Sequence, residues 1–136
     1  MSQPVFSWPV RVYWEDTDAG GVVYHAGYVR FYERARTEWL RSRGVIQSRM
    51  SADHGLMFVL YGLQLRFLRP ARLDDLLDVR LYLKTLTRTR MVIDHELYQS
   101  GDRTQLGQAT AEVACISAET FKPRPIPTDI VKELQA

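Results

Sequence analysis

The sequence predicts an α+β protein in which one long helix packs against a mainly antiparallel sheet. Three observations support this prediction: one extended stretch of helical periodicity, several stretches in which apolar and polar residues alternate, and a length of 136 residues, which suits one domain. Apolar residues make up 46% of the chain and charged residues 25%, as in typical globular proteins. This composition excludes a disordered, collagen-like or disulfide-rich chain, and we expect a single domain over residues 1–136.

The helix is expected over residues 26–43. Apolar side chains recur there at helical spacing, which predicts one buried stripe along the helix. Gly44 follows directly, where a left-handed C-cap is favoured. The recurring positions are Tyr28, Tyr32, Ala35 and Trp39, widened by Phe31 and Leu40.

Alternating stretches predict five strands around this helix. The first runs up to Glu15, the polar segment 47–55 is expected as a connection, and Ser100-Gly101-Asp102 marks a hairpin. Thr128 is expected as the N-cap of a short helix that ends near Leu134. Periodicity alone also allows other folds with one helix. The chain after the 47–55 connection is expected as strand, with clear alternation at residues 63–67, and the remaining strands are expected around residues 79–83, 91–99 and 105–117.

The charge balance gives little reason to expect a nucleic-acid partner. The net charge is +2, whereas nucleic-acid binders concentrate many basic residues on one face. Only three of the 18 basic residues are lysines, so 15 are arginines, whose planar forks bind phosphates and carboxylates well. A solvated surface role remains open for each arginine, including Arg88 and Arg90 at an expected hairpin tip.

The chain has one cysteine and no recognisable targeting segment. Cys115 cannot form an intramolecular disulfide, which fits a reducing compartment. Residues 1–9 lack a basic region followed by an apolar run, so no signal peptide is expected. The longest mostly apolar run, residues 55–65, is shorter than the about 20 residues that a membrane span needs. We therefore expect a soluble, cytoplasmic protein.

The strongest candidate site lies between the first strand and the helix. Three carboxylates, Glu15, Asp16 and Asp18, precede Gly20-Gly21, a pair that permits positive φ and close approach of a ligand to the backbone. The helix start presents unpaired N–H groups and the positive end of the helix dipole. A carboxylate facing such a helix start is typical of a hydrolytic site, with a base or nucleophile and a preorganised oxyanion site. The alternative is that the aspartates form Asx turns and that His25 caps the helix.

Other familiar chemistries lack the residues that they need. The three histidines are not spaced as in a zinc site, and the sequence contains no Gly-x-Ser-x-Gly elbow and no Walker-type phosphate loop. We therefore expect no metal ion.

Four stretches of the sequence resemble one known family. Residues 12–28, Val-Tyr-Trp-Glu-Asp-Thr-Asp-Ala-Gly-Gly-Val-Val-Tyr-His-Ala-Gly-Tyr, and residues 31–40 are similar to the tol-pal system-associated acyl-CoA thioesterases, often called the YbgC type. Pro-Ala-Arg-Leu-Asp-Asp at 70–75 and Lys-Pro-Arg-Pro-Ile-Pro at 122–127 extend the similarity over nearly the whole chain. This type belongs to the 4-hydroxybenzoyl-CoA thioesterase branch of the hot-dog superfamily. The resemblance therefore implies a five-stranded sheet curved around one helix. It also implies a hydrolase that converts acyl-CoA to free acid and CoA, with no cofactor beyond the CoA of the substrate.

The resemblance also implies roles for individual residues. Asp18, the second aspartate of the motif, corresponds to the catalytic carboxylate, which attacks the thioester carbonyl or activates a water. Backbone N–H groups at Tyr24 to Ala26 would bind the oxyanion, and His25 would orient substrate or water or assist proton transfer. The expected substrate contacts near this motif are Gly20, Gly21, Val22 and Ala26.

Members of this branch pair edge to edge as dimers, often two to a tetramer, with the active site between subunits. We expect Phe58, Val59 and Tyr61, from the uncharged run 55–65, to line a tunnel to the other subunit's Asp18. An ordinary place in the sheet core remains open for each of these three residues. Arg88 and Arg90 are candidates to bind the CoA phosphates. The family context implies phospholipid or envelope-linked lipid metabolism, with acyl carrier protein or phospholipid-synthesis enzymes as further partners.

Two other functions stay open. The first is a hot-dog hydratase or dehydratase, in which His25 with Asp18 or Glu33 would move protons next to the thioester carbonyl. The second is a module that binds acyl carrier protein or other lipid-synthesis proteins and hydrolyses thioesters only weakly.

Overall fold

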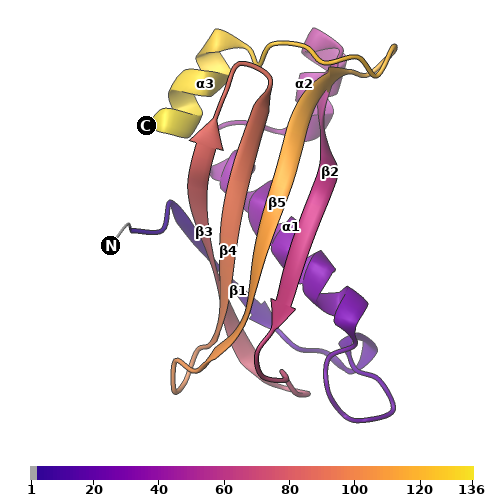
Figure 1. Ribbon diagram of the computed structural model, residues 1–136, viewed down its shortest axis with the longest axis vertical. Coiled ribbons are helices and arrows are strands. Elements are labelled where there is room, and N and C mark those ends of the chain that lie inside the picture. The colour runs from indigo at the N-terminus through magenta and orange to yellow at the C-terminus, as the bar shows by residue number, and fades with distance from the viewer. Residues whose placement is uncertain (1–2) are drawn as a thin grey trace.

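The long helix lies across one face of an antiparallel sheet in the computed structural model, which describes residues 3–136 (Figure 1). The first two residues of the N-terminal segment, for which no signal peptide is expected, lie outside the described part. Helix α1 spans His25–Ser42, close to the expected bounds, and Gly44 adopts the expected left-handed conformation, with a φ of 79°. The strands are β1 (Phe6–Arg11), β2 (Leu56–Phe67), β3 (Leu76–Leu86), β4 (Arg90–Gln99) and β5 (Gln105–Ser117).

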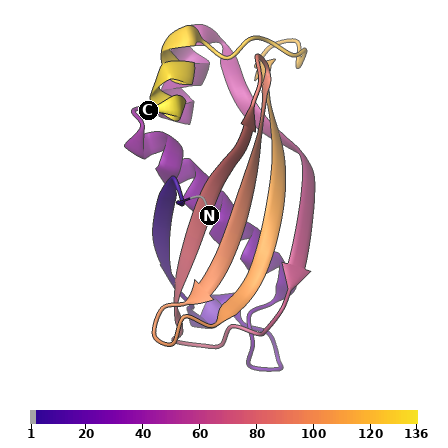
Figure 2. The ribbon, with the colours of Figure 1, turned by 60° about the vertical axis from the view of Figure 1, so that its left-hand side comes forward.

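The sheet has five strands in the order β1-β3-β4-β5-β2, and every neighbouring pair is antiparallel. The strands β3, β4 and β5 follow one another through hairpins, whereas β1 and β2 form the two edges. Figure 2 shows the sheet curling around α1, so that the helix lies inside the curve. The predicted α+β class, with one long helix and a five-stranded sheet, is confirmed.

The core forms where the apolar stripe of α1 meets the inner face of the sheet. Phe31, Ala35 and Trp39 are fully buried, and they pack with alternate residues of β3, β4 and β5. This arrangement follows from the sequence, because a helical repeat and a two-residue strand repeat each bring their apolar side chains to one face.

Three predicted boundaries are wrong. Strand β1 ends at Arg11 rather than Glu15, because the chain turns into a short 3₁₀ helix at Trp14–Asp16. The expected connection 47–55 contains helix α2 (Gln47–His54), which ends at Gly55 with a φ of 65°. Helix α3 (Thr128–Gln135) has Pro127 at its N-cap, so Thr128 is its first residue and not the cap.

One polar pair lies inside this core. Arg36 of α1 is 8% exposed and His95 of β4 is 1% exposed. Because a guanidinium can only donate, Arg36 Nη1 donates to His95 Nε2 over 3.1 Å, and His95 Nδ1 donates to the Ala109 carbonyl over 3.3 Å. Burial, reinforced by the neighbouring Arg36 charge, lowers the pKa of His95 to about 3. His95 is therefore neutral at ordinary pH.

The buried His95 makes the free energy of unfolding depend on pH. The unfolded chain binds a proton at this histidine below about pH 6.5, whereas the folded chain does not, so stability falls as the pH falls. Between pH 7.5 and pH 5 this single group removes about 2 kcal/mol. His95→Gln keeps an acceptor and a donor but cannot be protonated, so its stability should depend less steeply on pH by about that amount.

Urea unfolding at the two pH values measures this difference. His54→Gln, at the exposed end of α2, is the matched control and should retain the wild-type pH dependence. Equal pH slopes for wild type and His95→Gln would contradict the assignment of a neutral buried His95.

Candidate active site

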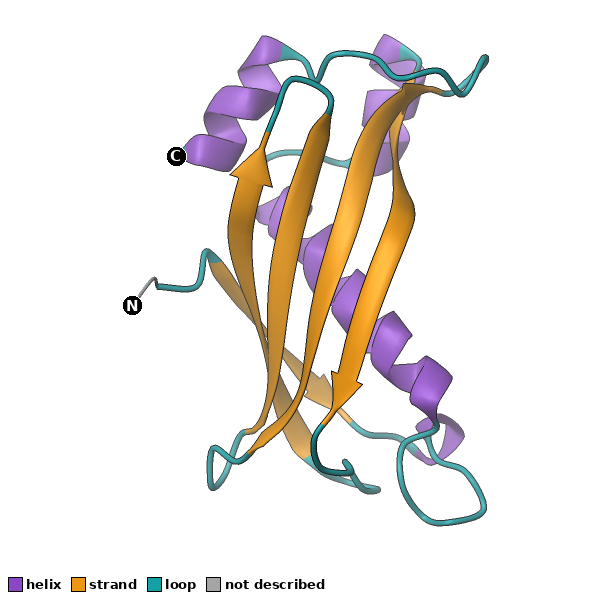
Figure 3. Cartoon of the chain, in the orientation of Figure 1, coloured by secondary structure: helices purple, strands orange, loops and turns teal. Residues whose placement is uncertain are grey.

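The segment from Asp16 to Tyr24 folds as a narrow hairpin that carries Asp18 at its tip. The Tyr24 N–H donates to the Asp16 carbonyl over 2.9 Å, and the Asp18 N–H donates to the Val22 carbonyl over 2.9 Å. The chain reverses at Gly21, whose φ of 76° favours glycine. Figure 3 shows this loop in teal beside the start of α1. The turn therefore fixes Asp18 close to the helix N-terminus.

Backbone contacts hold this hairpin against the rest of the protein. The Val23 N–H donates to the Ala71 carbonyl over 2.9 Å, and the Ala71 N–H donates to the Tyr28 hydroxyl over 3.1 Å. A Cβ atom on Gly27, in the first turn of α1, would lie only 3.0 Å from Val23 Cγ1. Glycine at this position lets the hairpin and the helix approach closely.

The three neighbouring carboxylates have different surroundings. Asp16 is buried and accepts the Tyr13 N–H over 2.8 Å, which is a structural role, whereas Glu15 is exposed. Asp18 Oδ1 accepts the Gly20 N–H over 2.8 Å, so the Asx turn of the alternative interpretation is present at Asp18. Within residues 3–136 no protein group donates to Asp18 Oδ2. One oxygen of Asp18 is thus held by the turn, and the other has no hydrogen-bond donor among the described residues.

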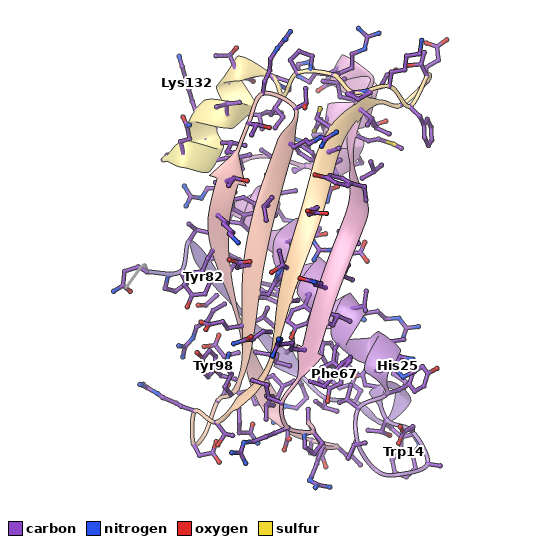
Figure 4. All side chains as sticks on the ribbon, viewed as in Figure 1. Trp14, His25, Phe67, Tyr82, Tyr98 and Lys132 are labelled. Atoms are coloured by element: carbon purple, nitrogen blue, oxygen red, sulfur yellow. The ribbon has the colours of Figure 1, made fainter. Side chains whose placement is uncertain are left out.

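Asp18 and His25 line the same surface pocket of about 380 Å³. Its walls are mostly apolar, and Phe67 contacts the Tyr28 ring edge-on at 5.3 Å between centroids. Figure 4 shows His25 and Phe67 at the same end of the molecule. An apolar pocket with a few polar groups is typical of a small-molecule site. The other lining residues are Val22, Val23, Leu68, Arg69 and Pro70.

The start of α1 presents two free backbone donors to this region. The Tyr24 N–H is already bonded to Asp16, and the Gly27 N–H donates to the Tyr24 carbonyl over 2.7 Å. In the described part of the chain, no group accepts from the N–H of His25 or Ala26. With the helix dipole, these two N–H groups favour an anionic oxygen.

The other predicted site residues lie elsewhere in the same chain. Phe58 lines a second cavity beneath α1, whereas Val59 and Tyr61 belong to the opposite face of β2. The guanidinium carbon of Arg90 lies 5.1 Å from the centroid of the Tyr61 ring. Arg88 lies in the turn of the β3–β4 hairpin, and Arg90 is the first residue of β4. That hairpin and the Asp18 loop are at opposite ends of the molecule (Figure 1). Within one chain the structure brings together only Asp18, Val22 and His25, with Gly20, Gly21, Tyr24 and Ala26 beside them.

Sequence reasoning missed part of the pocket wall. Phe67 and Leu68 carried no chemical signal, and they reach the pocket because β2 ends beside the hairpin. Arg69, which follows Leu68 in the sequence, lines the same wall. Glu33, which a hydratase could have used, is exposed and lines the second cavity rather than this pocket.

Two further properties concern the described residues 3–136 as a whole. No three His, Cys, Asp or Glu side chains gather there in an arrangement that could bind a metal ion. None of the helices in that range has the length and apolar character required to cross a membrane.

A curved antiparallel sheet around one long helix, with a carboxylate beside the helix start, defines a protein of the hot-dog class. The sequence matches the thioesterase-like superfamily over residues 12–134. It is 42% identical over 135 residues to the acyl-CoA thioester hydrolase YbgC of Escherichia coli O6:H1, with 99% of each chain covered. The chain therefore belongs to the thioesterase-like superfamily, as a member of its YbgC type, and the resemblance is confirmed.

Solved structures agree with this assignment. A 1,4-dihydroxy-2-naphthoyl-CoA thioesterase from Synechocystis superposes with a TM-score of 0.90 at 25% identity, covering 96% of this chain and 95% of that one. A probable thioesterase from Bartonella henselae superposes with a TM-score of 0.83 at 35% identity, covering 89% and 98%. The hot-dog fold implied by the sequence is thus confirmed.

The left-handed residue at the hairpin tip makes a prediction about stability. Gly21→Ala should lower the free energy of unfolding by about 1–2 kcal/mol, because an L side chain is strained at this φ. Gly101→Ala is the matched control, since it lies in another exposed turn with open space around it and no positive φ. Urea unfolding of both variants measures the difference, and equal stabilities would contradict the description of the turn.

Proposed function

We propose that this protein hydrolyses acyl-CoA thioesters to a free carboxylic acid and CoA. One observation carries the proposal: the Asp18 carboxylate, with its free oxygen, lines a pocket beside the unpaired N–H groups of His25 and Ala26. The names of the relatives, an acyl-CoA thioester hydrolase and a naphthoyl-CoA thioesterase, support the same reaction.

The arrangement suits the chemistry of a thioester. Sulfur donates weakly into the carbonyl and thiolate leaves readily, so the reaction needs no metal ion. Asp18 attacks the carbonyl carbon or takes a proton from an attacking water, and the oxygen that becomes negative accepts from the His25 and Ala26 N–H groups. The C–S bond then breaks, and the departing sulfur takes a proton as CoA is released. If water attacks, the free acid forms in this step. If Asp18 attacks, a water then hydrolyses the acyl–Asp18 anhydride, which releases the free acid and restores the carboxylate.

Two side chains of the pocket have supporting roles in this proposal. His25 lies at the pocket with its ring against Tyr24, 4.2 Å between centroids, and it orients the substrate or the water. Arg69 is the basic side chain of the same pocket, so it is placed to bind the phosphates of CoA. Arg88 and Arg90 remain candidates for this binding from a second subunit.

We further propose that two copies pair through β2, an edge strand of 12 residues. Leu60 is 43% exposed and Phe67 is 55% exposed, and a long apolar edge is a template for pairing with another strand. In an antiparallel pair the start of one β2 lies beside the end of the other. Phe58 of one copy therefore approaches Phe67 and the Asp18 pocket of its partner.

The wider setting rests on the resemblance to the YbgC type. It comprises a cytoplasmic location, association of dimers into a tetramer, a role in phospholipid or envelope lipid metabolism linked to the tol-pal system, and acyl carrier protein or lipid-synthesis enzymes as partners. These expectations remain proposals for this protein.

Asp18→Asn tests the reaction. It keeps the size of the side chain and an acceptor for the Gly20 N–H but removes the nucleophile or base, so kcat should fall about 100- to 10,000-fold. Thiol release from acyl-CoAs of two to 18 carbons and from benzoyl-CoA measures this loss. Glu15→Gln, an exposed carboxylate of the preceding turn, is the control and should keep its activity. Full activity in Asp18→Asn, or loss of conjugated enoyl-CoA absorbance without thiol release, would overturn the proposal.

Phe58→Ala tests the contribution of the second subunit. The change removes a ring from the proposed wall between the subunits and so enlarges the space for the acyl chain. The ratio of kcat/KM for long and short acyl chains should therefore shift roughly 10-fold. Met57→Ala, on the opposite face of β2, should leave the preference unchanged. Analytical sedimentation of the wild-type protein should also show a dimer or a larger oligomer. A monomer, or an unchanged chain-length preference and KM in Phe58→Ala, would sink the idea of a shared site.

A further inference from the structure

A second cavity lies between α1 and the inner face of the sheet, and the Asp18 pocket does not include it. It has a volume of about 80 Å³, enough for a few waters or one small polar group. Its walls are mostly apolar and come from β2, β4 and β5 on one side and α1 on the other. The apolar lining residues are Leu40, Phe58, Leu60, Met91, Ile93 and Val113.

This apolar cavity contains a buried cation that forms no ion pair within the described chain. Burial lowers the pKa of Arg36, and the charge of the exposed Glu33, one turn earlier, offsets this only in part. Arg36 lines the cavity and is only 8% exposed. Its one side-chain hydrogen bond in the described chain goes to His95, a neutral acceptor, and no carboxylate lies within ion-pair distance of it. Leaving a buried charge unpaired costs several kcal/mol, which a protein avoids unless the charge has a ligand.

A second orphaned donor lies in the same cavity. The Trp39 indole also lines it, and its Nε1 is buried with no acceptor among residues 3–136. The acidic side chain among the lining residues is Glu33, one turn before Arg36, which is exposed. The polar side chains of Thr37 and Gln47 complete the lining, and they bond to each other over 3.5 Å. The cavity therefore offers a positive charge and an N–H to an oxygen anion.

The position of β2 connects this cavity with the proposed reaction. Phe58 and Leu60, near the start of β2, line the Arg36 cavity, whereas Phe67, at its end, lines the Asp18 pocket. In an antiparallel pair of two β2 strands, the cavity of one copy adjoins the Asp18 pocket of the other. An acyl group whose thioester lies at Asp18 can then extend toward the partner's cavity.

We infer that Arg36 and Trp39 form a specificity site for acyl groups that end in a carboxylate. The inference rests on the proposed thioesterase function and deepens it, since it names the substrate class as dicarboxylic acyl-CoA. The thioester end reacts at Asp18 of one subunit, while the guanidinium and the indole N–H of the other subunit hold the distal carboxylate.

The test compares dicarboxylic acyl-CoAs, from adipoyl-CoA to sebacoyl-CoA, with fatty acyl-CoAs of the same length. Wild type should favour the carboxylate-ended series at one chain length. Arg36→Met preserves volume but removes the charge, so it should lower kcat/KM for that series about 10- to 100-fold and leave the methyl-ended series within about twofold. Trp39→Phe removes the N–H together with part of the buried ring, so it should cause a smaller loss for the carboxylate-ended series than Arg36→Met, measured relative to any loss for the methyl-ended series. Arg34→Met, an exposed arginine on the same helix, is the control.

A binding measurement separates this inference from the proposed function. Calorimetric titration with free suberate needs no turnover, and it should show binding to wild type that Arg36→Met abolishes while its melting curve shows a folded protein. The inference would be overturned if wild type hydrolysed dicarboxylic and fatty acyl-CoAs without preference, or if Arg36→Met affected both series equally. Either result would leave the proposed thioesterase activity intact. Suberate binding at Arg36 with no thiol release from any acyl-CoA would instead overturn the thioesterase.

Discussion

The hydrogen bond from the Tyr24 N–H to the Asp16 carbonyl is the contact on which the geometry of the site depends. It closes the hairpin, so the chain enters α1 with Asp18 beside the first helical turn. It also takes up the Tyr24 N–H, which leaves His25 and Ala26 as the first free donors. Since Ala71 pairs with the same hairpin, backbone bonds rather than loop packing hold Asp18 in place.

Helix α1 serves two purposes that conflict energetically. In the proposed reaction its first turn stays open to bind the oxyanion, while the following turns bury an apolar stripe that holds the fold together. Arg36 falls between Tyr32 and Leu40 on that buried stripe, where an apolar residue would stabilise the protein more. The neutral His95 satisfies Arg36 only in part, because it supplies a hydrogen-bond acceptor but no negative charge. Retaining a cation there is easier to explain by binding than by stability.

The sequence predicted the elements with long periodic patterns and the parts of the site that are local in the chain. The expected bounds of helix α1 and strand β5 are close to the observed ones. Adjacent residues alone singled out the segment from Glu15 to His25, whereas the family resemblance selected Asp18 among its three carboxylates. Helix α2 was missed because only Met50 is buried on it, so no repeating stripe exists. Phe67 and Leu68 were missed because their role depends on where β2 ends in space, which no local pattern encodes.

Strand β2 explains how the two cavities relate. Its inner face lines the Arg36 cavity near its start and the Asp18 pocket at its end, so within one chain they are separated along the strand. A two-fold antiparallel pairing reverses the direction of one strand and places unlike ends together. Each proposed composite site then takes its reactive carboxylate from one subunit and its charged acyl subsite from the other. An exposed apolar edge, otherwise an aggregation liability, becomes in this arrangement the element that completes the binding site.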